Sequence, residues 1–284
     1  MAQRCAITGA SGYLGGLVAR KLRADGWDVV ELGRNTGHSA TTFALGEPVS
    51  QTALSGCAAL VHCAYDFRQT AWQDIVRVNV EGSARLLEAA RTAGVGRIVV
   101  ISTISAFDGC RSMYGRAKLL IEDAAKRVDA AIIRPGLVYG PSPGAMFGKL
   151  VAQVRASSVL PMPGDGKQLM YTVHEDDLTE AIARALTSSS TPRAPVTVAN
   201  ETPVSFRDIL VGIGGRLNRP VTTVPTPWRL LWLGLRAAEF LRLPIGLRSD
   251  SMVSLVHQDT APLLNAESAL GVRCRPFDLS SIAL

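Results

Sequence analysis

Hydrophobic and polar positions fall into a repeating pattern through the first half of the chain. Short apolar runs predict buried strands, and most are followed by a stretch with the spacing of an amphipathic helix. The predicted strands are residues 4–8, 28–34, 59–64, 97–103 and 130–141, and the predicted helices are residues 12–26, 70–94 and 114–128. Strands that are apolar on both sides are typical of a parallel sheet covered on two faces. We therefore expect an α/β fold with a Rossmann-type, doubly wound parallel sheet.

The pattern changes after about residue 140, where prolines become frequent and the apolar runs become isolated. One clear helix is expected over residues 173–186, because acidic residues occupy its first turn. We predict two parts on this basis. The dinucleotide-binding domain comprises residues 1–140 plus about 170–200, and a smaller, partly discontinuous C-terminal substrate lobe comprises about 141–169 and 201–284.

Residues 228–247 form the most apolar segment of the chain. Its charged side chains, Arg229, Arg236, Glu239 and Arg242, gather on one side of a helix and leave a broad apolar face. These charges make the segment too polar to span a bilayer. We favour a helix packed on its own protein, and keep contact with a membrane surface or a partner as the alternative.

Composition indicates a folded protein with a small anionic ligand. The chain is 47% hydrophobic and 19% charged, and its net charge of +6 comes from scattered Lys and Arg residues, which does not favour nucleic acid. An odd number of cysteines without a CxxC pair indicates free thiols in a reducing, cytoplasmic compartment. We expect no secretory leader, and no metal site, because the histidines lack ligand spacing. The residues concerned are Cys5, Cys57, Cys63, Cys110, Cys274, His38, His62, His174 and His257.

Three glycines with GxxGxxG spacing follow the first predicted strand and open the first predicted helix. In that context Gly9 permits a tight turn, Gly12 lets a pyrophosphate approach the backbone, and Gly15 lets the helix pack close to the sheet. The helix N-terminus then faces the phosphates. The alternative is a glycine-rich bend that binds nothing.

The end of the second predicted strand bears on the choice of cofactor. An acidic residue there would suit the ribose hydroxyls of NAD, and an arginine would suit the 2′-phosphate of NADP. Arg34 occupies this place, and Glu31 comes two or three residues too early. We therefore favour NADP over NAD, with a merely solvated Arg34 as the alternative.

Tyr114 and Lys118 share one face of a predicted helix that follows a strand ending in Ser102 and Thr103. A neighbouring ammonium favours a phenolate, so we expect Lys118 to lower the pKa of Tyr114. Tyr114 could then act as general acid or base toward a hydroxyl or carbonyl, and Thr103 could orient the same oxygen.

The chain resembles the extended short-chain dehydrogenase/reductases of the NAD-dependent epimerase/dehydratase family. The resemblance covers about the first 185 residues in family order. It rests on TGASGYLG (8–15), VHCA (61–64), NVEG (79–82), ISTISAF (101–107), YGRAK (114–118), RPGLVYGP (134–141) and VHEDDL (173–178).

The resemblance implies roles for individual residues. Thr103 would be the catalytic hydroxyl, Tyr114 the acid/base, and Lys118 its partner, which also binds the nicotinamide ribose. Asn79 would help to hold the geometry near the active site, and His174 and Asp177 would anchor the second lobe. The implied cofactor-binding residues are Gly9, Ser11, Gly12, Tyr13, Leu14, Gly15, Arg34, Cys63, Ala64, Asn79, Tyr114, Lys118, Pro135 and Val138.

The chain also departs from the family pattern. Phe107 replaces the usual tyrosine after the Ser/Thr strand, and only ten residues separate Thr103 from Tyr114. Ala44 and Leu45 stand where an acidic residue usually contacts the adenine. These differences put a standard sugar-nucleotide pocket in doubt and leave the catalytic set intact.

We therefore predict an NAD(P)-dependent oxidoreductase or epimerase that acts by hydride transfer on a secondary alcohol or ketone, such as that of a nucleotide-sugar. Dehydration is disfavoured, because no added acid/base pair lies near Thr103. The alternative is a non-catalytic NAD(P)-binding sensor or assembly protein. A steroid or lipid-like substrate is less favoured, because Trp228, Trp232 and Phe240 are better explained as core aromatics. A homodimer through residues 72–93 and 114–128 is possible.

Overall fold

The computed structural model describes residues 2–34, 41–49, 51–141, 144–243 and 246–283, so that His38 lies outside the described residues. A seven-stranded sheet forms the centre, and every strand pair in it is parallel. The order is β11 (Val196–Val198), β6 (Ala131–Pro135), β5 (Arg97–Ile101), β4 (Ala59–His62), β1 (Arg4–Thr8), β2 (Asp28–Gly33), β3 (Thr41–Thr42). The predicted Rossmann-type sheet is confirmed.

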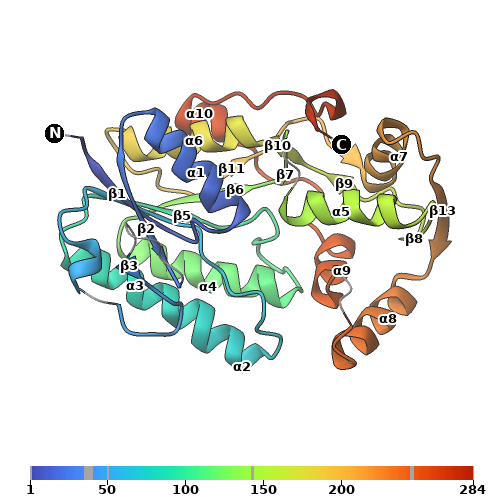
Figure 1. Cartoon of the computed structure of the whole chain (residues 1–284), viewed down its shortest axis with the longest axis horizontal. Helices are drawn as coiled ribbons and strands as arrows, with labels where there is room; N and C mark the ends of the chain where they lie inside the picture. The colour runs from blue at the N-terminus through green and yellow to red at the C-terminus, as the bar shows by residue number, and fades with distance from the viewer. Residues whose placement is uncertain (1, 35–40, 50, 142–143, 244–245, 284) are drawn as a thin grey trace.

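Helices cover both faces of this sheet (Figure 1). One face carries α1 (Tyr13–Ala24), α6 (Glu175–Thr187) and the short α10 (Ala266–Leu270), which share a core with alternate residues of the strands. The other face carries α3 (Glu81–Thr92) and α4 (Met113–Arg127), which close a second core. The predicted strand–helix alternation thus gives the two apolar layers that a parallel sheet needs.

The predicted helix over residues 70–94 forms, but it is not a uniform α-helix. It consists of α2 (Trp72–Ile75), a π-helical segment over Val76–Val80, and α3. The wider turn contains Asn79, which is fully buried. A π-turn changes which side chains face inward without changing the apolar pattern, so the sequence pattern does not predict it.

The predicted strand over residues 130–141 is divided in two. After β6 the chain passes through Gly136 into β7 (Leu137–Tyr139), which leaves the main sheet and pairs with β10 (Thr172–His174). A Cβ on Gly136 would lie 2.3 Å from the carbonyl oxygen of Tyr171. The close approach of the two segments therefore requires a glycine where the strand changes partner.

The rest of the chain builds a smaller unit around a third core that includes Phe147 and Ile209. Part of the predicted smaller lobe packs elsewhere, because α10 joins the core of the main sheet. The elements of the smaller unit are α5 (Ala145–Ala156), β8 (Val159–Pro163), β9 (Leu169–Met170), β12 (Val204–Ser205), α7 (Phe206–Arg216), β13 (Thr222–Thr226), α8 (Trp228–Phe240) and α9 (Ser249–Val256). Short 3-10 turns lie at Gln51–Leu54 and Leu279–Ser281.

Helix α8 lies at the periphery of the molecule, packed against α9 and β8 (Figure 1). Only Ala238 of its residues is buried. The expectation of a helix packed on its own protein is therefore wrong for most of its apolar face. Within the described ranges, no helix is both long and apolar enough to cross a bilayer.

Candidate active site

The glycine turn after β1 has the tight geometry that its spacing predicts. Gly9 has a φ of +72°, and its carbonyl accepts a hydrogen bond from the Gly12 amide at 2.9 Å. A Cβ on Gly15 would lie 2.2 Å from the same carbonyl oxygen. Any side chain at Gly15 would therefore force α1 away from the turn, and this packing accounts for the third glycine.

The start of α1 suits an anionic group. Gly12 is its N-cap without a side-chain cap, and its first turn contains no acidic residue. The first-turn amides, beginning at Tyr13 and Leu14, have no acceptor within the helix, and the macrodipole adds positive potential there. Ser11 is exposed in the turn. The Tyr13 side chain instead donates to Glu175 Oε2 at 2.7 Å and so ties the turn to α6.

The ends of β1 and β4 are fixed together beside this turn. A Cβ on Gly9 would lie 3.0 Å from the Ala64 Cα, and the Ala64 amide donates to Thr8 Oγ1 at 3.2 Å. The His62 ring connects β1 with α3: its Nδ1 lies 2.7 Å from Thr8 Oγ1, and its Nε2 lies 2.8 Å from Ser83 Oγ. Burial lowers the pKa of His62 to about 3, so that it stays neutral. The structure thus brings Gly9 together with the predicted residues after β4.

Asn79 holds the loop that follows these residues. Its Oδ1 accepts from the Asp66 amide at 2.6 Å, and its Nδ2 donates to the Asp66 carbonyl at 3.2 Å. The π-turn directs the Asn79 amide at this loop. Asn79 therefore supports the geometry beside the site, as the resemblance implies.

Pro135 and Val138 close the same region from the β6 side. The Pro135 carbonyl accepts from the Ile104 amide at 3.0 Å, which joins the ends of β5 and β6. Val138 packs against the same core as Leu14 and Cys63. Residues predicted to line a cofactor from three distant stretches therefore lie around one edge of the sheet.

Arg34 follows β2 directly and is exposed. Glu31, the one acidic residue in β2's second half, forms an ion pair with Arg23 at 2.6 Å. Its carboxylate is thus held toward α1 by an arginine. Arg34 is therefore the charged side chain that directly follows β2, whereas Glu31 is already paired with Arg23.

Thr103, Tyr114 and Lys118 come together at the carboxyl end of β5. Thr103 follows β5, and its side chain hydrogen-bonds with that of Tyr114 in the first turn of α4. One turn later, Lys118 Nζ donates to the Ile101 carbonyl at 2.7 Å. The Lys118 ammonium lies 5.9 Å from the centre of the Tyr114 ring. The sequence spacing correctly predicts this juxtaposition.

The electrostatics of this set differ from the expectation. Burial raises the pKa of Tyr114 to about 12, although the hydrogen bond with Thr103 acts in the opposite direction. Burial likewise lowers the pKa of Lys118 to about 8, against the favourable charges of Cys63 and Glu122. The expected lowering of the Tyr114 pKa by Lys118 is wrong here, because desolvation of the buried phenol dominates. Tyr114 is therefore protonated at neutral pH.

Ser102, the other hydroxyl at this strand end, points elsewhere. Its Oγ donates to Glu122 Oε1 at 2.5 Å. The same carboxylate receives two hydrogen bonds from Arg134, of 2.7 and 2.6 Å. Glu122 is fully buried in this network, one helical turn beyond Lys118. Ser102 thus ties the end of β5 to Glu122 of α4, and Arg134 ties β6 to the same carboxylate.

Aromatic rings that the sequence analysis missed surround Tyr114. Tyr65 lies edge-on to it with ring centres 5.0 Å apart, and Phe67 lies 5.5 Å away. The Lys118 ammonium also lies 5.1 Å from the Tyr65 ring centre. Phe67 is 54% exposed, so an apolar ring lies at the surface beside Tyr114. Tyr65 directly follows the VHCA motif and Phe67 comes two residues later, so their position in the sequence could have indicated that they lie near the site.

The smaller unit reaches the catalytic helix through Asp250 in α9. The two carboxylate oxygens accept from the Met113 amide at 2.8 Å and the Tyr114 amide at 2.9 Å. Glu239 in α8 in turn accepts from the amide and hydroxyl of Ser249, at 2.7 and 2.8 Å. No local sequence signal links residues so far apart in the chain. Asp250 caps the first turn of α4 at Met113 and Tyr114.

Asp177 fastens the C-terminal segment to the start of α6. Its carboxylate accepts from the Arg275 side chain at 2.6 Å and from the Arg275 amide at 2.8 Å. His174 caps the same helix, accepting from the Asp176 amide at 3.2 Å. Both residues are thus engaged in contacts within the protein.

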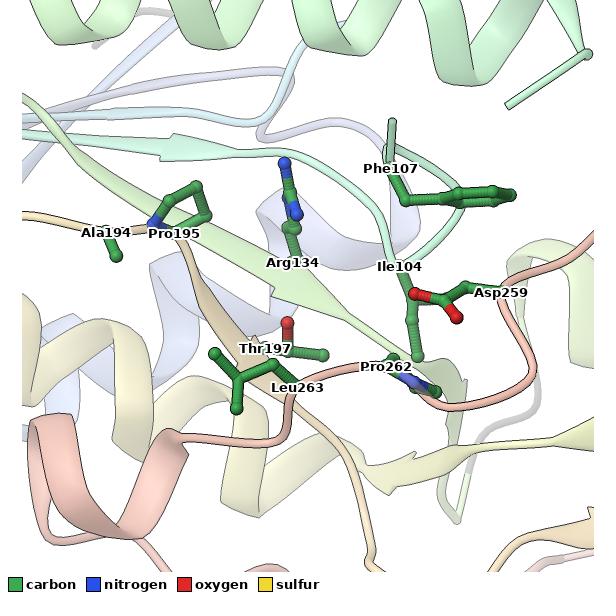
Figure 2. A pocket seen from close by; sticks show the side chains of 9 residues that line it. All are labelled: Ile104, Phe107, Arg134, Ala194, Pro195, Thr197, Asp259, Pro262 and Leu263. Atoms are coloured by element: carbon green, nitrogen blue, oxygen red, sulfur yellow. The ribbon is translucent and has the colours of Figure 1, made fainter. Parts of the chain in front are cut away.

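A pocket of about 200 Å³ opens beside the site, on the β6–β11 side. Figure 2 shows Arg134 and Thr197 on these neighbouring strands, facing a segment that follows α9. The pocket does not include the catalytic set, and the Arg134 guanidinium is already paired with Glu122. Its lining residues are Ile104, Phe107, Arg134, Ala194, Pro195, Thr197, Asp259, Pro262 and Leu263.

All five cysteines are described, and all are free thiols. Burial raises the pKa of Cys63, the one nearest the site, to about 12. In the described part of the chain, no group of His, Cys, Asp and Glu residues could hold a metal ion.

Comparison with known proteins agrees with this geometry. Residues 5–199 match the model of the NAD dependent epimerase/dehydratase family. The chain is 31% identical over 190 residues to a ceramide reductase of Caulobacter vibrioides, covering 63% of this chain and 59% of that protein. It is 24% identical over 276 residues to a decarboxylating sterol-4-alpha-carboxylate 3-dehydrogenase of Mus musculus, covering 85% and 75%.

Several relatives are much longer than the region they share with this chain. Three mycobacterial proteins match at 26% identity over only 24% of their own length. Among solved structures, MoeE5 in complex with UDP-glucose and NAD superposes with a TM-score of 0.75 at 21% identity, covering 98% of this chain and 95% of that one. This likeness shows the fold. Because the family match covers more than half of the chain, the protein belongs to the NAD-dependent epimerase/dehydratase family, within the extended short-chain dehydrogenase/reductases.

Proposed function

We propose that the protein is an oxidoreductase or epimerase that interconverts a secondary alcohol and a ketone, with Tyr114 as the acid/base. The observation that supports this most directly is the convergence of Thr103, Tyr114 and Lys118 at the carboxyl edge of the sheet. The glycine turn lies at the same edge, where open α/β sheets bind their ligands.

The residues at this edge fit a dinucleotide. Gly9, Gly12 and Gly15 let the turn pack closely against α1 and the end of β4, since a Cβ at each would meet backbone atoms, and the uncapped start of α1 suits a pyrophosphate. When bound, the nicotinamide supplies or accepts the hydride. We propose NADP rather than NAD, because Arg34 is a cation at the end of β2 and Glu31 is paired with Arg23.

The protonation states suit the reduction of a carbonyl. Tyr114 keeps its proton at neutral pH and can donate it to the oxygen of a substrate carbonyl. Thr103 can hydrogen-bond with the same oxygen. Lys118 is charged below pH about 8 and can stabilise negative charge that develops there.

Two substrate classes follow from different observations. A nucleotide-sugar is supported by MoeE5, whose structure contains UDP-glucose and NAD. An apolar ketone or alcohol is supported by the exposed Phe67 over Tyr114 and by the ceramide reductase and sterol dehydrogenase relatives. Phe107 and the short segment after Thr103 weigh against a standard nucleotide-sugar pocket, so both classes belong in one substrate panel.

The test combines binding with turnover. Thermal shift with NAD and NADP identifies the cofactor, because a ligand of the folded state raises the melting temperature. Turnover is then measured with nucleotide-sugars, sterols and long-chain ketones. Tyr114→Phe should abolish turnover and preserve cofactor affinity. The matched control is Tyr171→Phe, whose hydroxyl donates to the Thr260 carbonyl.

Equal turnover by Tyr114→Phe and the wild type would refute the assignment of the acid/base. Cofactor binding without turnover of any substrate would favour a non-catalytic sensor on the same fold.

The free thiols are compatible with the proposed cytoplasmic compartment. We also propose a homodimer through residues 72–93 and 114–128, where Leu120 is an exposed leucine on α4. Light scattering during size exclusion tests this.

A further inference from the structure

Helix α8 and the residues that follow it expose a continuous apolar surface. Five large side chains of this surface are between 51% and 87% exposed. Leu230, Leu233 and Phe240 share one face of α8, and Leu241 and Leu243 follow directly after its end. These residues, called the α8 surface below, are Leu230, Leu233, Phe240, Leu241 and Leu243.

Cations surround the α8 surface. Arg229, Arg236 and Arg242 are exposed, and the carboxylate of the same stretch, Glu239, is hydrogen-bonded to Ser249. The Arg229 guanidinium lies over the Trp228 ring, 5.8 Å from its centre, and the Arg236 guanidinium lies over the Trp232 ring, 5.9 Å from its centre. Leucine and phenylalanine on one face, flanked by arginine and tryptophan, form the pattern of helices that lie in a bilayer interface.

We propose that the protein docks on an anionic lipid bilayer through the α8 surface. The apolar side chains enter the boundary between headgroups and acyl chains, and the three arginines contact the lipid phosphates. A second copy of the chain fits this surface less well than a bilayer does, because a two-fold symmetric contact would place the same arginines of the two copies against one another. The charge of the surface is complementary to anionic headgroups.

A chain of contacts links α8 and α9 to the candidate active site. Arg248, between α8 and α9, donates to the Gln69 carbonyl at 3.2 Å and so holds the loop that carries Phe67. Phe67 contacts Tyr114, and Asp250 of α9 caps the helix of Tyr114. The α8 surface and the active site are therefore joined by one set of contacts. Docking does not depend on the hydride chemistry, and it is measured without turnover.

The experiment is flotation of the full chain with vesicles of phosphatidylcholine alone or mixed with phosphatidylglycerol. The wild type should bind the mixed vesicles and bind phosphatidylcholine at least tenfold more weakly. Replacing Arg229, Arg236 and Arg242 together by Gln should lower binding to the mixed vesicles on the order of a hundredfold, since each arginine contributes about a fivefold factor. Leu233→Glu/Phe240→Glu should abolish binding.

Leu263→Glu is the matched control, because this leucine is 75% exposed and lies outside α8. It should bind as the wild type does, and the melting temperatures of all variants should agree within a few degrees. A direct readout comes from Phe240→Trp, whose added fluorescence should shift to shorter wavelength on addition of mixed vesicles.

Two results would overturn the proposal. The first is a wild type that does not float with mixed vesicles, or α8 variants that float as well as the wild type. The second is a wild type that dimerises in light scattering, becomes monomeric in Leu233→Glu/Phe240→Glu and does not float; a second copy would then be the occupant.

Discussion

Replacing Asp250 should impair both the stability of the protein and the placement of Tyr114. Its two carboxylate oxygens accept from the Met113 and Tyr114 amides at 2.8 and 2.9 Å, at the positive end of α4. The side chain is also largely buried. Asp250→Ala leaves these two amides without their acceptor, while the other cap, Ser112, keeps its bond to the Gly115 amide.

The magnitude follows from the cap and the helix dipole. Loss of an N-cap costs about 1 kcal/mol, and loss of a carboxylate beside the dipole costs up to about 1 kcal/mol more. We therefore expect Asp250→Ala to lower the free energy of unfolding by about 2 kcal/mol. Because the freed amide belongs to Tyr114 itself, kcat should fall by roughly tenfold, with little change in KM. Asp250→Asn retains one acceptor oxygen and should lie between.

The assay is urea unfolding together with steady-state kinetics on a substrate from the panel. The matched control is Ser205→Ala, which removes the cap of α7, where Ser205 Oγ accepts from the Asp208 amide at 3.0 Å. It should lose about 1 kcal/mol of stability and keep the wild-type kcat. If Asp250→Ala loses stability and keeps kcat, Asp250 is only a structural cap, and the reasoning about Tyr114 placement is refuted.

Two further predictions concern Lys118 and the glycine turn. Because the folded pKa of Lys118 is lowered from 10.5 to about 8, the unfolded state binds its proton more tightly between these values, and Lys118 should make a contribution to the free energy of unfolding that rises with pH there. Lys118→Met should lack this contribution. The difference in free energy of unfolding between the two proteins should therefore change by up to about 3 kcal/mol across pH 8 to 10.5, which separates Lys118 from the other titrating groups. A difference that stays constant with pH would contradict a buried ammonium. Gly15→Ala should weaken dinucleotide binding at least tenfold in calorimetry, since its Cβ would meet the Gly9 carbonyl oxygen at 2.2 Å. The control Gly16→Ala, whose Cβ would have its nearest contact at 3.3 Å, should bind the dinucleotide as the wild type does. Equal affinities of the two variants would show that the turn can adjust to the added Cβ.

The sequence predicts the central sheet well, because strand burial on both faces leaves a direct trace in apolar runs. The glycine turn and the Thr103–Tyr114–Lys118 set could also be predicted, since each depends on spacing within one strand–helix junction. Burial of Tyr114 could not be predicted in the same way. Its pKa depends on Tyr65 and Phe67 packing over it, and on a loop that Asn79 holds from within a π-turn.

Contacts between distant residues account for the rest of what the sequence could not predict. Asp250 caps α4 across 136 residues of chain, and no local pattern connects the two positions. The exposure of α8 was misjudged for a related reason. Apolar periodicity shows that a helix has an apolar face, but only the packing of α9 and β8 shows how little of that face is covered.

The link between Asp177 and Arg275 has a consequence for synthesis of the chain. Residues of α10 and Val272 complete the core under α1 and α6, and Arg275 joins Asp177 across 98 residues. Domains otherwise fold as units from the N-terminus while the chain is made. Here the nascent dinucleotide-binding part lacks one wall of its core until residue 275 has left the ribosome. The emerging chain therefore exposes apolar surface that chaperones can bind until residue 275 has emerged.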